Sequence, residues 1–189
     1  HEAEIAQAEA ITGRKPFVKY WVHMGILDIS GNKMSKSLGN YITVKDALKE
    51  HGVDELRLYF CNQNYRNRIE LNSSELRSAS ESALTIEQTI KKLKLLLHKS
   101  RSSSRQITEK QWKKFEVDFY NALDDDLNTP HAITALLSFV QWVKNDLKKN
   151  ASRETIEDIL QSLLSICWIL GLSFANEYRI NSKHGVIRN

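Results

Sequence analysis

SSELRSASESALTIEQTIKKLKLLLH, residues 73–98, is the stretch of sequence that decides the fold class of this chain. Its apolar residues recur at alternating intervals of three and four, at Leu76, Ala79, Ala83, Ile86, Ile90, Leu93 and Leu97. This spacing places them along one face of an α-helix, and an apolar stripe of this length has to pack against partner helices. We therefore predict a helix over residues 74–98 with Ser73 as its N-cap.

Three more amphipathic helices are predicted after a polar linker at residues 100–105. A Thr108–Gln111 capping box, Thr129 followed by proline, and Ser152 mark their N-termini. Apolar residues at helical spacing line each helix: Trp112, Phe115, Phe119 and Ala122 in the first, Ile133, Leu136, Leu137, Val140, Val143 and Leu147 in the second, and Ile156, Leu160, Leu163, Cys167 and Leu170 in the third.

The chain is thus predicted to have a mainly α fold in two parts. Residues 73–171 are expected to form one antiparallel helical bundle. Residues 1–72 are mixed α/β and too short to close a parallel sheet alone, so they look like the end of a larger nucleotide-binding domain. Their expected elements are a helix over 1–12 ending at Gly13, extended segments over 17–29, a turn at 30–32, a helix over 44–51 capped by Thr43, and a helix over 55–63 capped by Asp54. The tail, residues 172–189, stays unassigned.

Composition narrows the class of protein. Hydrophobic residues make up 41% of the 189 residues, enough for a packed core, and 7 Gly with 2 Pro favour long helices over a turn-rich sandwich. Cys61 and Cys167 lie far apart in sequence, which excludes a disulfide framework or a zinc finger and favours a reducing, cytoplasmic setting. Each is expected to be a plain buried residue. No membrane span is predicted. Because the first residue is His, we expect a fragment or a processed product.

The loop KMSKSLGN at residues 33–40 carries the most specific chemical signal. Two lysines flank hydroxyl groups, and a lysine ammonium donates well to phosphate oxygens. A mobile lysine facing a departing pyrophosphate would lower the barrier to adenylate formation by electrostatic stabilisation. On residue types alone, a solvated surface loop explains the same pattern.

The exact string KMSKS is the signature of class I aminoacyl-tRNA synthetases. The flanking sequence narrows the family: HEAEIAQAEAITGRKPFVKYWVHMGILDISGNKMSKSLGN is similar to cysteinyl-tRNA synthetases throughout, and the resemblance continues through DELRLYF, NYRNRIEL and DDDLNTPHAI. It covers roughly residues 1–171. The resemblance implies the end of a Rossmann-type catalytic domain with a stem-contact region over residues 1–72, followed by a tRNA-binding bundle.

The resemblance implies a reaction as well. Cysteine and ATP, with magnesium, give cysteinyl-adenylate, and the cysteinyl group passes to tRNA(Cys); we expect a monomer. Lys36 is expected to contact the ATP phosphates as a catalytic residue, with Lys33 in support. The remaining ATP-binding candidates are Ser35, Ser37, and the backbone near Ile26 and Leu27. Met34 is expected to anchor the loop by packing, and Trp21 to lie in the core. The family's His-Ile-Gly-His motif is absent, so residues 1–189 alone are expected to be inactive.

The family also has a zinc ion that selects cysteine, because a thiolate is a much better zinc ligand than a hydroxyl. Its ligands are the first of two adjacent histidines, a Glu three residues after the second of them, and two cysteines. Here His1 matches the second histidine, which is no ligand, and Glu4 matches the ligand Glu. Cys61 and Cys167 match no ligand position. The chain is therefore expected to supply at most one metal ligand of the intact enzyme, Glu4.

The resemblance implies contacts with tRNA after the loop and along the bundle, and such contacts go mostly to phosphates. Residues 71–105 hold seven Lys and Arg against three Asp and Glu, a net charge of +4, although a solvated helix face has the same composition. The candidate tRNA-binding residues are Lys45, Lys49, Arg66, Arg68, Lys91, Lys92 and Lys94.

Two other functions stay open on the sequence. A ligase that joins cysteine to an amino sugar, as in mycothiol synthesis, would share the activation chemistry, and a tRNA-free product assay separates it. A non-catalytic tRNA-binding fragment would need only the helices. Asp124, Asp125 and Asp126 resemble a magnesium site, but three consecutive carboxylates do not share a helix face, so we expect them to cap or be solvated.

Overall fold

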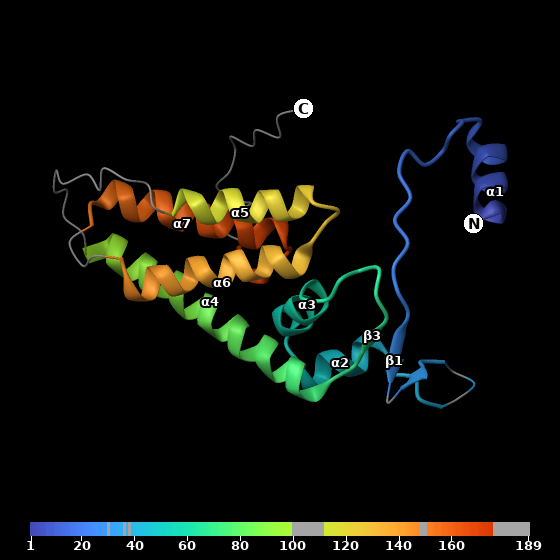
Figure 1. The fold of residues 1–189 in the computed structure, drawn as a ribbon, viewed down its shortest axis with the longest axis horizontal. Coiled ribbons are helices and arrows are strands. Elements are labelled where there is room, and N and C mark those ends of the chain that lie inside the picture. The colour runs from blue at the N-terminus through green and yellow to red at the C-terminus, as the bar shows by residue number, and fades with distance from the viewer. Residues whose placement is uncertain (30, 36, 38, 100–111, 148–150, 176–189) are drawn as a thin grey trace.

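The computed structural model of the chain describes residues 1–29, 31–35, 37, 39–99, 112–147 and 151–175, with the side chains of Asn32 and Lys33 left out. The described residues are mainly helical, as predicted (Figure 1). The helices are α1 (Glu2–Thr12), α2 (Val44–Glu50), α3 (Val53–Cys61), α4 (Ser73–Lys99), α5 (Lys113–Asp124), α6 (Thr129–Asn145) and α7 (Arg153–Ile169), and the strands are β1 (Leu27–Ile29), β2 (Asn32–Lys33) and β3 (Ile69–Glu70). The predicted linker at 100–105 and the Thr108–Gln111 capping box lie outside the described residues.

Helices α4 to α7 form a bundle in which successive helices run in opposite directions, with α4 crossing obliquely beneath the other three (Figure 1). The apolar stripes meet at its centre, where Ile86, Leu93, Phe119 and Phe139 are fully buried. The rings of Phe115 and Phe139 stack with centroids 5.5 Å apart. The periodicity of the sequence thus identified the residues that form this core. Among the described residues, no helix is long and apolar enough to cross a membrane.

Two of the predicted helix caps are wrong by one residue. Asn72, not Ser73, caps α4, because its Oδ1 accepts hydrogen bonds from the backbone N–H and the hydroxyl of Ser74 at 2.9 and 2.7 Å. Asn128, not Thr129, caps α6, accepting from the N–H of His131 at 3.3 Å. Asparagine is as good an N-cap as serine, so a helix that begins one residue earlier is satisfied equally well.

The cap predicted for α3 is wrong as well. Gly52 occupies the N-cap position, and its N–H donates to the Glu55 carboxylate at 3.2 Å. The carboxylate of Asp54 instead accepts from the backbone N–H of Ser173 at 2.6 Å and from the Ser173 hydroxyl. Asp54 therefore binds Ser173, which is remote in sequence, and does not cap its own helix. The predicted caps Thr43 and Ser152 are confirmed, since each accepts from a backbone N–H three residues on.

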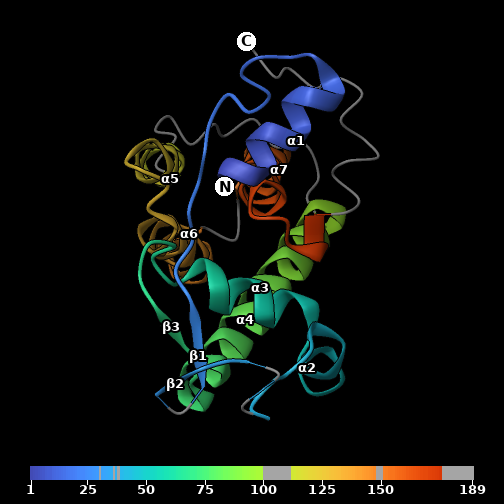
Figure 2. The same cartoon turned by 90° about the vertical axis from the view of Figure 1, so that its right-hand side faces the viewer.

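The strands form a small sheet of order β2-β1-β3, with β1 antiparallel to β2 and parallel to β3. Of the extended segment predicted over 17–29, only Leu27–Ile29 is a strand. Residues 14–26 run outward to α1 as a single extended chain (Figure 1). A strand is defined by pairing, and of this segment only residues 27–29 pair with β2 or β3. Helix α1 stands at the end of this chain and buries none of its residues (Figures 1 and 2).

Candidate functional site

The loop at residues 33–40 begins in β2, the strand that pairs with β1, and hydrogen bonds hold both of its ends. The N–H of Met34 donates to the carbonyl of Leu27 at 3.2 Å, and the N–H of Ser35 donates to Oδ1 of Asn40 at 2.9 Å. The hydroxyls of Ser35 and Ser37 lie 3.2 Å apart. The predicted phosphate-binding Lys36 lies outside the described residues, as does the side chain of Lys33.

A mostly apolar groove with a volume of about 540 Å³ lies next to the start of the loop, between strand β1 and helices α2 and α3. Met34 is half-buried at its edge and enters the groove from the loop side. The other residues that line it are Leu27, Ile29, Ile42, Thr43, Val44, Ala47, Leu48, Val53, Leu56, Arg57, Phe60, Cys61 and Leu71. This arrangement agrees with the expectation that Met34 anchors the loop by packing, because its side chain has an apolar surface to rest on.

The segment before the loop differs from its prediction in one respect. Trp21 does not lie in the core: it is 43% exposed and packs against the rings of His1 and His23, with centroid distances of 5.3 and 6.2 Å. It stays outside because no helix of the bundle reaches the single extended chain on which it lies. The predicted adenine-contacting positions are Ile26 and Leu27. Leu27 begins the central strand β1 and Ile26 directly precedes it, and their carbonyls accept from the N–H groups of Met34 and Ile69, respectively.

The predicted zinc ligand Glu4 lies on α1 with its side chain 63% exposed. Within the described part of the chain, no three His, Cys, Asp or Glu side chains gather closely enough to hold a metal ion. The described residues therefore do not fit a zinc site by themselves, and no catalytic step is assigned to zinc.

Neither cysteine forms a disulfide; Cys167 is buried as predicted, whereas Cys61 is only half-buried. Cys167 is fully buried in the bundle, and burial raises the pKa of its thiol to about 12. Cys61 is half-buried at the groove, where burial raises the pKa of its thiol and nearby Arg57 opposes that shift. A thiol with a raised pKa is a poor nucleophile and a poor metal ligand, so both cysteines are structural.

Several candidate tRNA-binding residues already have partners on the protein. Lys49 pairs with Asp46 at 2.6 Å and Lys91 with Glu87 at 2.7 Å, each within one helix. Arg68 lies 3.3 Å from the buried Asp28. Exposed ion pairs of this kind are weak, so their Lys and Arg side chains can still bind a polyanion. Lys45 is exposed on α2.

At one end of the bundle, α4 and α6 finish where α5 and α7 begin (Figure 1). The Lys92 ammonium donates to the carbonyl of Lys144 at 3.3 Å, and the Arg153 guanidinium donates to the carbonyl of Leu97 at 3.0 Å. Exposed basic residues from four helices therefore share this end: Lys91, Lys92, Lys99, Lys113, Lys114, Lys144 and Arg153. The last four were missed by the sequence analysis. The fold brings Lys144 and Arg153 into contact with α4, whereas Lys113 and Lys114 lie on α5, which packs against α6.

Asp126 was expected to cap a helix or be solvated, and its side chain is indeed 60% exposed, but it also has partners that the sequence did not predict. Its carboxylate accepts from Arg66 Nε and Nη2, each at 2.8 Å, and from the Tyr65 hydroxyl at 2.8 Å. These hydrogen bonds lower the pKa of Asp126 from its usual 3.8 to about 2. No local pattern could have found this contact, since the partners are 60 residues apart in sequence.

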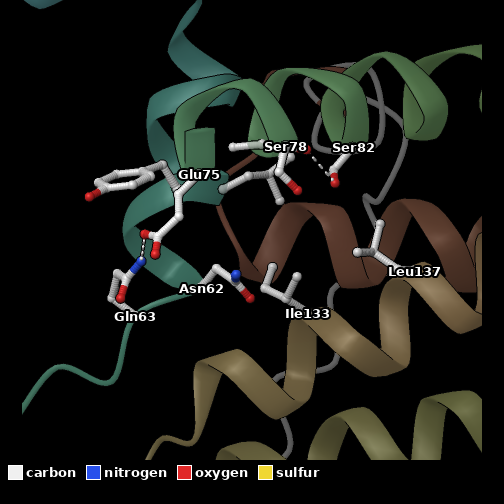
Figure 3. A pocket seen from close by; sticks show the side chains of 10 residues that line it. Asn62, Gln63, Glu75, Ser78, Ser82, Ile133 and Leu137 are labelled. Carbon is white, nitrogen blue, oxygen red and sulfur yellow. Dashed lines mark hydrogen bonds between the residues drawn. The ribbon is translucent and has the colours of Figure 1, made fainter. Parts of the chain in front are cut away.

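A second pocket lies between α3, α4 and α6 (Figure 3), where Glu75 accepts from the Gln63 amide at 2.8 Å. Asn62, Ser78 and Ser82 add polar groups, and Ile133 and Leu137 close the opposite side (Figure 3). Its volume is about 100 Å³. Sites for drug-sized ligands are several times larger, so this pocket is too small for a nucleotide.

Comparisons with known proteins define the class. Residues 1–81 match the family described as tRNA synthetases class I (C) catalytic domain, and residues 118–175 match the DALR domain. A solved structure, the ternary complex of Agrobacterium radiobacter K84 agnB2 LeuRS-tRNA-LeuAMS, superposes with a TM-score of 0.68 over 93% of this chain and 24% of that chain. At 18% identity it shows a shared fold only. Residues 1–81 are thus similar to the catalytic domain of class I tRNA synthetases.

The sequence relatives are more specific. The chain is 38% identical to a cysteine–tRNA ligase of Bacillus cytotoxicus over 97% of this chain and 40% of that protein. It is 36% identical to one of Aquifex aeolicus over 84% of this chain and 32% of that protein. It is 34% identical to one of Pyrobaculum islandicum over 91% of this chain and 37% of that protein. The chain is therefore similar to cysteine–tRNA ligases over most of its length, and it spans well under half the length of these relatives.

Proposed function

We propose that this chain is part of an enzyme that activates cysteine with ATP and transfers it to tRNA(Cys). The observation that carries the proposal is the KMSKS loop at residues 33–37, which lies inside the region that matches the class I catalytic domain. The sequence relatives named above support cysteine as the amino acid. We propose a cytoplasmic location, supported by two cysteines that form no disulfide, and a monomer.

The loop supplies groups suited to the departing pyrophosphate. Lys36 is proposed to place its ammonium against the ATP phosphates, where negative charge grows as the bond to the α-phosphorus breaks. Lys33, Ser35 and Ser37 are proposed to bind the same phosphates, together with a magnesium ion carried by ATP. The hydrogen bonds of Ser35 to Asn40 and of Met34 to Leu27 support this role, because they hold the loop at its ends.

The remaining parts have proposed roles of their own. Residues 1–72 would be the end of a Rossmann-type catalytic domain with the stem-contact region, and residues 73–171 the tRNA-binding bundle. Adenine is proposed to contact the backbone near Ile26 and Leu27. Glu4 would supply a single ligand to a zinc ion. Residues 172–189 have no proposed role.

The basic residues are proposed to contact tRNA phosphates. The set comprises Lys45, Lys49, Arg66, Arg68, Lys91, Lys92 and Lys94, joined by the basic residues at the shared end of the bundle, Lys113, Lys114, Lys144 and Arg153. Contacts to phosphates position a nucleic acid without reading its sequence, and they weaken with added salt. The proximity of Lys92 to Lys144 supports one continuous basic surface across α4 and α6.

The test compares variants in the whole protein. Lys36→Ala is expected to slow cysteine-dependent ATP–pyrophosphate exchange by roughly 100-fold, the typical loss when one transition-state donor is removed. Lys19→Ala, on the extended segment before the loop, is the matched control and should retain full exchange. Equal rates for Lys36→Ala and the wild type would remove the proposed role of the loop. Exchange with cysteine, but no charging of tRNA, would point instead to transfer of cysteine to another acceptor.

A further inference from the structure

The connector between α3 and β3, residues 62–68, meets the turn between α5 and α6 across a single charged contact. Asp126 lies in that turn and faces the connector, where Tyr65 and Arg66 converge on its two oxygens. Thr129, at the start of α6, reaches the carbonyl of Gln63 at 3.5 Å. The contact thus joins the bundle to the segment that leads into the sheet.

This contact is as exposed as the ion pairs within α2 and α4, but its geometry differs from theirs. Arg66 offers two parallel N–H groups to both oxygens of Asp126, and Tyr65 adds a third donor at the same 2.8 Å. A planar, bidentate arrangement fixes direction as well as distance, which a single lysine pair does not. The Arg66 guanidinium also lies over the Tyr65 ring, 5.0 Å from its centroid. The three side chains therefore hold one another in place.

The backbone on the bundle side is held in an unfavourable conformation to make this contact. Asp126 and Leu127 have φ angles of 52° and 54°. The left-handed region costs about 1–2 kcal/mol for a residue with a β-carbon, and leucine lacks the local hydrogen bonds that make it tolerable for Asp. Hydrogen bonds from Leu127 to Leu123 and from Asn128 to Ala122 keep the turn closed. Strain of this kind persists where a function requires the geometry.

From the connector, hydrogen bonds lead to the loop. The carbonyl of Tyr65 accepts from the N–H of Gly25 at 2.7 Å, and the N–H of Ile69 donates to the carbonyl of Ile26 at 3.0 Å. One residue further on, the carbonyl of Leu27 accepts from Met34 in the KMSKS loop. The connector that Asp126 holds is therefore in direct contact with the strand from which the loop emerges.

We infer that Asp126, Arg66 and Tyr65 form a clasp that fixes the orientation of the loop-bearing sheet relative to the bundle, and that Asp126 is a positioning residue for the tRNA-dependent step. The inference rests on the proposed function. A tRNA bound along the bundle has to present its 3′ end to a centre beside residues 33–40. The angle between the sheet and the bundle decides whether the 3′ end of the tRNA reaches that centre. The clasp sets this angle at the connector.

The clasp competes with a direct role of Arg66 in binding tRNA, and one substitution separates the two. Asp126→Asn removes the charge that holds the guanidinium. If Arg66 meets tRNA phosphates directly, its release leaves tRNA binding unchanged or strengthens it. If Asp126 positions the connector through Arg66, the same substitution lowers kcat/KM for tRNA. Asp124→Asn, in the same acidic run and exposed, is the matched control.

The experiment measures kcat/KM for tRNA cysteinylation in the whole protein with Asp126→Asn, Arg66→Ala and the double variant. Each single variant is expected to lose roughly 3- to 30-fold, the range for a residue that couples two sites, and the double variant no more than the worse single one. The exchanged pair Arg66→Asp with Asp126→Arg should regain part of the loss, which a general loss of stability would not allow. Additive losses, or a gain with Asp126→Asn, would overturn the clasp.

A second measurement does not depend on the proposed function. Amide hydrogen exchange at Gly25, whose N–H donates to Tyr65, should speed up in Asp126→Asn and not in Asp124→Asn. A wild-type protein that charges no tRNA would refute the proposed function, and the exchange at Gly25 would still decide whether the clasp holds the strand. Unchanged protection of Gly25 in Asp126→Asn would refute the clasp.

Discussion

Gly25 is the position where a single methyl group should have the largest local effect on the loop-bearing sheet. A β-carbon added there would lie 1.7 Å from the carbonyl oxygen of Asn67 and 2.5 Å from its carbonyl carbon. Both are backbone atoms, which cannot turn aside as a side chain would. Since ordinary contacts begin at 3.4 Å, the connector has to move away from the strand by about 1.7 Å in Gly25→Ala.

The loss in the free energy of unfolding follows from the hydrogen bonds that this movement of the connector breaks. The hydrogen bond from Gly25 to Tyr65, 2.7 Å long, cannot survive it, and the one from Ile69 to Ile26 is strained. Each lost hydrogen bond costs about 1 kcal/mol, and overpacking adds about 1–3 kcal/mol. The expected loss in the free energy of unfolding is therefore about 2–5 kcal/mol, a large part of the 5–15 kcal/mol typical of a folded protein.

Urea unfolding of the whole protein, followed by circular dichroism, measures this loss. Gly52→Ala is the matched control, because its β-carbon would meet only side-chain atoms of Glu55 at 3.4 Å, and its φ of −68° suits alanine. It should lose about 1 kcal/mol or less, since glycine there serves as an N-cap. If Gly25→Ala is no less stable than Gly52→Ala, the close approach of connector and strand is not as described.

Three further outcomes are expected. Iodoacetamide at pH 8 should alkylate half-buried Cys61 at least about ten times faster than Cys167, because burial raises the pKa of the Cys167 thiol to about 12. Peptide mass spectrometry measures the two rates, and equal rates would contradict the buried position of Cys167. Asn72→Ala should destabilise the chain by about 1 kcal/mol and Ser73→Ala by a few tenths at most, and the reverse order in thermal unfolding would restore Ser73 as the cap. The pKa of Asp126 is lowered in the folded state from 3.8 to about 2, so the clasp should be complete above about pH 4 and should open as the pH falls toward 2. An NMR titration of the Asp126 carboxyl group with its midpoint near pH 4 would refute the contact. Arg66→Ala should raise the midpoint to about pH 4.

The helical part of the fold was predictable because its signal is local and repeated. The stripe from Leu76 to Leu93 is buried as its spacing predicted, as are Phe119 and Val143 in the helices that follow. The cap positions were less certain, because Asn72 and Ser73 are adjacent and both suit the N-cap. Asp54 shows a different limit, since the residue that binds it, Ser173, lies 119 positions away.

The candidate site likewise has features that the sequence predicts and features that only the structure shows. The KMSKS loop and the turn that precedes it are continuous in sequence, so they could be found without a structure. The surface shared by Lys92 and Lys144 and the contact of Arg66 with Asp126 could not, because each joins residues more than 50 positions apart. Charge and residue type alone placed Arg66 among the tRNA contacts and gave no indication of the carboxylate that holds it.

The amino-acid sequence by itself determined that this protein is mainly helical, which residues fill the bundle, and where the KMSKS motif lies. Each of these depends on the periodicity or identity of residues close together in the chain. Only the tertiary structure decided which strand of the extended segment pairs, what holds Asp126, and how the bundle is attached to the sheet. Those outcomes depend on distances between segments remote in sequence, which are settled only when the whole chain packs.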